Sequence, residues 1–501
     1  MNKVLLAFAL LTTSIATLHA QSIGGQFELY PDTTGVIATA NANGRIDTRN
    51  IFFQSSLATN GRSCSTCHQA DQAMSMTPDR AQELFVQTHG RDPLFAAVDG
   101  ANCPNARTGD QGAHSLILSH GLIRVSVTIP ANPAFQLVVV HDPYGCALTQ
   151  DPVTHQYIVS EYRRPLPSTN LRFLSAVMFD GRESPSTSAL NNPLTFPVNL
   201  QTDLKHQAQD AITTHFQGAP ASDQVLDDIV AFEMGLYTAQ VYDRQAGVLD
   251  LNGGQGGVRA LMPQDYHPGI NDVLGADPYG VPFTSSSMTL FSAWQAASVQ
   301  SVKGGAEFEP FYARFDTARR AQARRDVAAG EILFNTAPIT ITGVRGLNDN
   351  SAIGPSLKGT CTTCHDAPNV GDHSLPLPLD IGIGHSPRPG LETDPSVAAG
   401  IAQLNEPDLP VFLVKGCTDP FGGAPVSFYT TDLGKGAVTG ACADLNRVKG
   451  PILRGLAGRA PYFHNGAAKT LMQAVNFYNE RFTMNLTDQQ KLQLVAFLNT
   501  L

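Results

Sequence analysis

One short motif occurs twice in the chain and restricts its structure more than any other feature. Cys64–His68 and Cys361–His365 both have the pattern C-x-x-C-H. Two thiols at this spacing can bond the two vinyl groups of one porphyrin, and the histidine that follows is then held beneath the iron. The two copies therefore predict two covalently bound c-type haems, with His68 and His365 as the proximal ligands.

A zinc knuckle and a redox-active dithiol are the alternatives for these two boxes. Zinc would require a third and a fourth thiol or imidazole close by, in a compact module. A thioredoxin-like dithiol would not need a histidine directly after the second cysteine in both copies. Haem is therefore the favoured interpretation. The attachment residues are then Cys64, Cys67, Cys361 and Cys364.

The first twenty residues have the composition of a secretory signal. Lys3 precedes an apolar run from Val4 to Leu11, and the small residue Ala20 is suited to cleavage. This run is too short to span a bilayer, and no later segment is long and apolar enough to do so. We therefore expect a signal peptide over residues 1–20 and a soluble mature protein that is periplasmic or secreted, because bacteria attach haem c outside the cytoplasm.

Four of the eight cysteines lie outside the boxes. In an oxidising compartment four spare cysteines indicate two disulfides, for which three connectivities exist. We predict Cys103–Cys146 and Cys417–Cys442, because each pair closes a loop within one domain. The alternative is that these residues are free buried thiols, which are less common in exported proteins.

The chain is acidic. Its formal net charge is −10 at pH 7, and removal of Lys3 with the signal makes the charge more negative. Because like charges repel, neither nucleic acid nor an anionic membrane is expected as a partner. The charge does not identify the redox protein that would dock on this surface.

Each box follows a segment with helical character, which divides the chain into two predicted haem domains. Ile46–Leu57 is expected to be a short helix ahead of the first box, and Ala318–Phe334 a charged helix ahead of the second. The N-terminal domain would then cover residues 21–317 and the C-terminal domain residues 318–501. A capping box, Thr487–Gln490, precedes a last amphipathic helix.

Residues 90–165 are expected to be an insertion in the first domain. Leu122–Ile129 and Phe135–Val140 are rich in Val, Ile and Leu at strand length. Farther on, Ser222–Tyr242 has a helical apolar face, and residues 243–290 are expected to form loops. The fold class predicted from these segments is mainly α, with two class I cytochrome c-like haem domains, long loops and a small disulfide-pinned β insertion in the first.

Several further segments carry a family resemblance. Met178–Arg182 looks like an F-W-D-G-R segment, and Thr431–Lys435 with Val438–Gly440 looks like T-D-x-G-R followed by V-T-G. Lys449–Arg454 and Ala460–Gly466 look like K-T-P-x-L-R and A-P-Y-F-H-D-G. Together with the boxes, these segments make the chain resemble the bacterial diheme cytochrome c peroxidases and the related MauG-type oxidases. The resemblance covers most of the chain after residue 45, apart from the insertion and some loops.

The resemblance implies a division of labour between two haems. The N-terminal haem would reduce hydrogen peroxide, and a six-coordinate C-terminal haem would relay electrons from a small cytochrome or cupredoxin. A MauG-type oxidase would use the oxidising equivalents on an organic or protein substrate instead, and a homodimer is a candidate assembly. Two alternatives stay open: a non-catalytic diheme electron-transfer cytochrome, with Met74 or Met76 on the first iron, and a diheme oxygenase acting on a hydrophobic organic substrate.

Three positions depart from the family pattern. The methionine ligand of the C-terminal haem in the peroxidases falls on Tyr478 here, as in the MauG-type oxidases, and a phenolate would lower the potential of that haem. If Tyr478 is only a core residue, Met472 and Met484 are the next candidates. The family's tryptophan between the haems is Phe179, which is much harder to oxidise. No glutamate occupies the distal position, which leaves His215 as the candidate catalytic acid–base residue.

Three more residues follow from the resemblance. A calcium ion between the domains is a family feature, and Asn170 and Thr439 stand where its ligands are expected. His464 lies in a motif whose histidine sits close to the C-terminal haem without being its usual sixth ligand, so we expect it to support that site. The cofactors implied are two haems c and one calcium ion.

Overall fold

The computed structural model describes residues 21–23, 27–184, 196–298, 317–371, 378–384 and 408–501, except for residues 274, 276, 369 and 422. The predicted signal peptide, residues 1–20, lies outside this part of the chain. Among the described helices none is long and apolar enough to cross a membrane.

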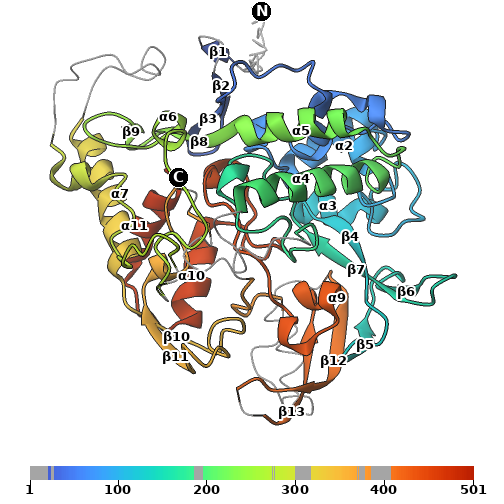
Figure 1. Ribbon diagram of the computed structural model, residues 1–501. Helices are drawn as coiled ribbons and strands as arrows, with labels where there is room; N and C mark the ends of the chain where they lie inside the picture. The colour runs from blue at the N-terminus through green and yellow to red at the C-terminus, as the bar shows by residue number, and fades with distance from the viewer. Residues whose placement is uncertain are drawn as a thin grey trace, which may run out of the picture.

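The expectation of a mainly α fold is wrong. The structure is 32% helical with 19% strand, and the strands in its described part form four sheets (Figure 1). Two of these sheets join segments that are far apart in the sequence, so periodicity within one segment could not reveal them. The structure therefore does not show two class I cytochrome c-like domains, and sheets occur in both halves of the chain.

One sheet has five strands in the order β1-β2-β3-β8-β9. Its fourth strand corrects the expectation of a single helix over Ser222–Tyr242. The first part of that segment is the helix α5 (Asp223–Gly235), but the rest is the strand β8 (Leu236–Asp243). β8 pairs antiparallel with the distant strand β3 (Gly35–Asn41), and both are almost entirely buried. This tertiary pairing overrides the local helical pattern.

The insertion and the C-terminal part of the chain together form two small sheets that share a core, in the orders β4-β7-β6 and β13-β12-β5. Strands β4 (Ile123–Thr128) and β5 (Gln136–His141) confirm the two predicted strands. However, β5 pairs with β12 (Val411–Thr418), which is drawn in orange beside the teal β5 in Figure 1. A single apolar core joins this sheet to the sheet that contains β4. The insertion is therefore not a separate element of the first half.

Both predicted disulfide pairs stand at bonding distance. The Cα atoms are 6.0 Å apart in Cys103–Cys146 and 5.6 Å apart in Cys417–Cys442. Cys417 lies on β12, and Cys442 begins the short turn η10 (Cys442–Asp444) that follows α9. Each bridge closes a loop and so reduces the conformational freedom of the unfolded chain.

The C-terminal part is built on two long helices. α7 (Ala318–Thr336) confirms the helix predicted ahead of the second box, and α11 (Asp488–Leu498) confirms the last helix with its capping box. The two helices pack against each other, and the guanidinium of Arg324 on α7 lies 5.5 Å from the ring centre of Trp294. The helix expected over Ile46–Leu57 is instead two short 3-10 helices, η1 (Ile51–Phe53) and η2 (Ser55–Leu57).

The remaining helices and strands connect these units. Among the described residues of 243–290, only β9 and α6 are regular, in agreement with the loops expected there. The further elements are β1 (Gln21–Ile23), β2 (Phe27–Pro31), α1 (Cys64–Cys67), α2 (Pro78–Thr88), α3 (Ser115–His120), β6 (Leu148–Gln150), β7 (Tyr157–Arg163), α4 (Phe196–Thr213), β9 (Gly247–Val248), α6 (Val258–Leu261), β10 (Ile339–Thr342), β11 (Ser356–Gly359), η9 (Cys361–Thr363), β13 (Pro425–Thr430), α9 (Lys435–Thr439), η11 (Leu456–Gly458) and α10 (Leu471–Arg481).

The core that the sheets of β4 and β12 share predicts a large effect of Phe412→Ala. Phe412 on β12 is fully buried in that core, whereas Phe421, in the turn between β12 and β13, is 43% exposed. Removing a buried phenylalanine ring costs about 3–5 kcal/mol in the free energy of unfolding. Phe421→Ala, the matched control, should cost about 0.5 kcal/mol or less. Urea unfolding curves of the two variants check this, and equal midpoints would contradict a common core.

Candidate functional site

The two C-x-x-C-H boxes have the same local structure. In the first box the Ser63 backbone N–H donates to Thr66 Oγ1 at 3.0 Å, and in the second the Thr360 N–H donates to Thr363 Oγ1 at 2.9 Å. Both are capping boxes, which hold the turn between the two cysteines. None of the four box cysteines forms a disulfide with another described cysteine. Each box therefore presents two thiols and the following histidine from one turn.

Both histidines are held in the form that binds a metal. His68 Nδ1 lies 3.3 Å from the carbonyl oxygen of Met74, and His365 Nδ1 lies 3.2 Å from that of Val370. Donation from Nδ1 leaves the lone pair on Nε2, which fixes the tautomer and the direction of the ligand atom. Burial lowers the pKa of each imidazole to about 4, so both rings are neutral at physiological pH.

Each box opens on its own cavity. We name them the first cavity, which is lined by Cys64, Cys67 and His68, and the second cavity, which is lined by the corresponding residues of the second box. The two cavities share one wall, formed by Arg164, Pro165, Leu166, Phe179 and Lys449. From the resemblance of Met178–Arg182 to a family motif we expected Phe179 to lie between two haems. In the structure Phe179 is part of the wall common to both cavities.

His215 lies in the first cavity, next to a carboxylate that the sequence did not single out. Its Nδ1 is hydrogen-bonded to Asp99, which also forms a buried ion pair with Arg62. Burial opposes ionisation of Asp99, but the charges of Arg62 and His215 outweigh it and lower the pKa of that carboxyl. Asp99 lies in the insertion, far from His215 in the sequence, so only the fold brings the two together.

The methionines considered for the first iron are core residues. Met74 packs with Phe52 and Phe232, and Met76 packs with Leu94 and Phe95. Neither is among the residues that line the first cavity. Met178, which the sequence analysis noted only as part of a motif, does line it.

Tyr478 lies in the second cavity, beside the second box. Its ring centre is 6.4 Å from that of His365, with an angle of 79° between the planes, and it also packs against Phe463, Phe477 and Phe482. Burial raises the pKa of the hydroxyl. Met484 lines the same cavity, whereas Met472 is not among its lining residues.

The two residues suggested as calcium ligands have separate surroundings. The Asn170 side chain is buried and exchanges both of its hydrogen bonds with the backbone of Thr238 on β8. Thr439 is exposed at the end of α9, and its hydroxyl bonds Lys435 O of the same helix. The described residues contain no group of three or more His, Cys, Asp or Glu side chains that could hold a metal ion.

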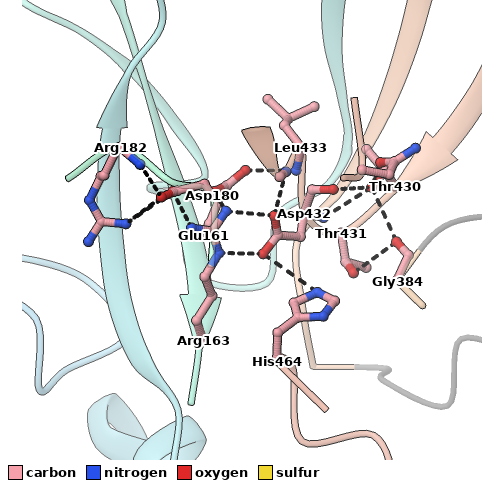
Figure 2. Close-up of polar contacts among 12 residues, drawn as sticks. Glu161, Arg163, Asp180, Arg182, Gly384, Thr430, Thr431, Asp432, Leu433 and His464 are labelled. Atoms are coloured by element: carbon pink, nitrogen blue, oxygen red, sulfur yellow. Dashed lines mark hydrogen bonds and ion pairs between the residues drawn. The ribbon is translucent and has the colours of Figure 1, made fainter. Parts of the chain in front are cut away.

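Residues from three segments that resemble family motifs lie around Arg163, the last residue of β7 (Figure 2). These segments are Met178–Arg182, Thr431–Lys435 and Ala460–Gly466. Its guanidinium donates to Asp432 at 2.7 and 2.8 Å and also pairs with Glu161 and Asp180. His464 Nε2 lies 3.6 Å from Asp432 Oδ2. Burial raises the pKa of Glu161, whereas Arg163 outweighs burial and holds that of Asp432 low.

This buried cluster connects the two cavities. Arg163 lines the first cavity and His464 the second. The His464 ring also packs edge-on against Phe179 in the common wall, with 6.1 Å between the ring centres. His464 therefore contacts the common wall and lines the second cavity, and its role in support of a haem stays a prediction.

The comparisons with known proteins agree in part with the resemblance found from the motifs. No protein-family model matches the chain. The cytochrome-c peroxidase IdrP2 of Denitromonas iodatirespirans is 34% identical over 152 residues, which make up 29% of this chain and 36% of the relative. The chain thus matches only about a third of the length of this curated relative. The similarity supports a peroxidase-like cytochrome, and the finer family assignment stays a prediction.

The position of Tyr478 predicts a spectroscopic effect of Tyr478→Phe. If the phenol oxygen is the sixth ligand opposite His365, its removal opens the iron and changes the ferric spin state. Tyr478→Met should instead raise the potential of that haem, because thioether ligands favour the reduced iron. The control is Tyr462→Phe, since Tyr462 lines the same cavity but donates its hydroxyl to Leu456 O at 3.1 Å.

Electron paramagnetic resonance spectra and potentiometric titration measure both effects. A ferric spectrum that is the same in Tyr478→Phe, Tyr462→Phe and the unmodified protein would show that Tyr478 is a core residue. Met484, which lines the same cavity, would then be the next ligand to test.

Proposed function

We propose that this chain is an exported two-haem c-type cytochrome that reduces hydrogen peroxide in the first cavity, with electrons relayed through the second. The observation that carries the proposal is that two boxes of the same local structure open on two cavities with a common wall. The partial similarity to a cytochrome-c peroxidase supports the choice of peroxide as substrate. In the overall reaction, one peroxide molecule takes up two electrons and two protons and gives two water molecules.

The donor set of each cavity fits haem c. Two thiols outside any disulfide and a neutral imidazole line a largely apolar space, and these residues would hold a porphyrin through two thioether bonds and one nitrogen ligand. Cys64, Cys67 and His68 would hold one haem, and the second box would hold the other. When bound, haem supplies an iron that exchanges electrons with peroxide and with the donor.

His215 would move the proton in the first cavity. Because its Nδ1 bonds Asp99, Nε2 is the nitrogen available to take a proton from one peroxide oxygen and return it to the other. Asp99 fixes the tautomer of this ring, and Arg62 keeps Asp99 ionised and in place. The aspartate thus acts through the histidine and is a positioning residue.

The second cavity would serve electron relay. The proximity of the Tyr478 and His365 rings supports Tyr478 as a second protein ligand of that haem, and a phenolate ligand would close the iron to peroxide and lower its potential. Phe179 in the common wall is hard to oxidise, so electrons would cross the wall without an oxidised side chain as an intermediate. A small cytochrome or a cupredoxin is the proposed donor.

The surroundings of Met74 and Met76 argue against these two residues as ligands of the first iron in a purely electron-transferring cytochrome, because both pack in apolar clusters outside the first cavity. Met178 does line that cavity, and the His215–Asp99 pair in the same cavity is the feature that favours peroxide chemistry there. We further propose that the N-terminal half, residues 21–317, carries the reaction site and that residues 318–501 carry the relay. The proposed location is the periplasm or the exterior of the cell.

Cofactor content tests the proposal first. A haem assay and the intact mass should give two covalent haems per chain. Replacing Cys64 and Cys67 with alanine should remove one, and replacing Cys361 and Cys364 should remove the other. The control replaces Cys417 and Cys442 with serine, because these cysteines lie outside the boxes and both haems should be kept. Recovery of zinc in place of haem would exclude this function.

Peroxide turnover tests the proton-transfer site. Loss of a general acid–base residue lowers kcat/KM by about 10²–10⁴-fold, and this is the effect expected for His215→Ala. Asp99→Asn should lower it by about 10–100-fold, because the ring loses its orientation. The control is His206→Ala on the preceding helix, whose side chain bonds Glu183 and does not line the first cavity.

Two further measurements separate catalysis from folding. Both haems should still be bound in the His215 and Asp99 variants, and added imidazole should restore part of the activity of His215→Ala. If His215→Ala and His206→Ala reduce peroxide at the same rate as the unmodified protein, the acid–base residue is not His215.

A further inference from the structure

Two guanidinium groups lie together in the wall region between the cavities. Arg164 directly follows β7 and lines both cavities, whereas Arg459 follows η11 and lines the second. The Arg164 guanidinium contacts the backbone of Arg459, because Nη2 donates to the Arg459 carbonyl at 3.1 Å. The two positive charges are close enough that, besides burial, the charge of Arg459 lowers the pKa of Arg164.

Arg164 is held by carbonyl oxygens. Besides Arg459 O, Nη2 reaches Ala460 O at 3.5 Å, and Nη1 donates to His120 O at 3.3 Å and to Gly121 O at 3.1 Å. A side chain at Gly121 would place its Cβ 1.8 Å from Arg164 Nη1, so the site depends on a glycine there. Carbonyl oxygens orient the guanidinium but do not neutralise its charge.

Arg459 has unused donors. Its Nε and Nη2 are buried and have no hydrogen-bond partner within the described part of the chain. Burial lowers the pKa of Arg459 to about 10 and, together with the charge of Arg459, lowers that of Arg164 to about 9. A buried guanidinium with unpaired N–H groups is costly unless an anion meets it.

The other buried arginines of the first cavity are compensated. Arg62 pairs with Asp99, and Arg163 pairs with three carboxylates. No carboxylate from the described residues forms such a pair with Arg164 or Arg459. Within the described part of the chain the positive charge of these two arginines is therefore not balanced by an ion pair. Two adjacent N–H donors of one guanidinium match the two oxygens of a carboxylate.

We propose that Arg164 and Arg459 form a carboxylate-binding site between the two cavities. Two sources have this chemistry: a propionate side chain of a bound haem, and a small diffusible carboxylate. The first source rests on the proposed function, because it requires haem in the second cavity. Since Arg164 lines both cavities, its charge acts on both haems, whereas that of Arg459 acts mainly on the second.

Potentiometric titration of the full haem-loaded protein tests the site. Reduction makes a haem more negative by one charge, so a nearby cation favours the reduced state and its removal lowers the potential. In Arg459→Gln the ratio of reduced to oxidised second haem, at fixed applied potential, should fall about tenfold, which equals about 59 mV. Arg164→Gln should lower the reduction potentials of both haems. Arg459→Lys keeps the positive charge, so the potential of the second haem should stay close to that of the unmodified protein.

The control is Arg447→Gln. Arg447 is a partly buried arginine of the same half that bonds Asp444 and lines neither cavity, so both potentials should be unchanged. If Arg164→Gln does not fold, Arg164→Lys replaces it; this variant keeps the charge and should keep both potentials. The potential of the second haem in Arg459→Gln then tests the propionate as the ligand. Unchanged potentials in Arg459→Gln, with two haems bound, would overturn the propionate as the ligand.

Added acetate, with chloride at matched ionic strength as reference, distinguishes the sources. A propionate-filled site gives potentials and melting temperatures that do not respond to acetate. A diffusible carboxylate gives a rise in melting temperature with acetate, which Arg459→Gln abolishes. No potential shift and no acetate effect would reject the site altogether. An unmodified protein without two haems would contradict the proposed function, and the acetate measurement would still test this site.

Discussion

The contact on which the rest of the structure depends is the buried ion cluster at Arg163. Its guanidinium belongs to β7 of the insertion, yet it bonds Asp180 from the N-terminal half and Asp432 from the C-terminal half. Removing one partner from a buried ion pair costs about 3–5 kcal/mol, because the other charge is left unpaired. The cluster therefore fixes how the two halves meet, and with them the wall that separates the two cavities.

The cluster and the wall bring together three segments that lie far apart in the sequence and that resemble family motifs. Met178–Arg182 contributes Phe179 to the wall and Asp180 to the cluster, Thr431–Lys435 contributes Asp432, and Ala460–Gly466 contributes His464. None of these residues belongs to a box. They have in common that they form or contact the wall between the two cavities, and in the proposed function the thickness of this wall would set the distance of electron transfer.

The sequence predicted local features well and long-range pairing poorly. The boxes, both disulfide pairs, the helices at Ala318 and Asp488 and the two strands of the insertion follow from spacing and periodicity within short windows. The mainly α fold was wrong because β8 and β12 gain their strand conformation from distant partners. Asp99 could not be predicted either, since no pattern links it to His215 before the chain folds.

The two sites owe their difference to these distant contacts. The capping interactions and the carbonyl acceptors of His68 and His365 are nearly the same, so the boxes alone would make two equivalent haem sites. The two cavities differ in the residues that line them away from the box. The first holds the His215–Asp99 pair, which can move protons, and the second holds Tyr478 within a cage of aromatic rings. Tertiary structure thus gives the two copies of one motif different surroundings, and it is on this difference that the proposed division between proton transfer and electron relay rests.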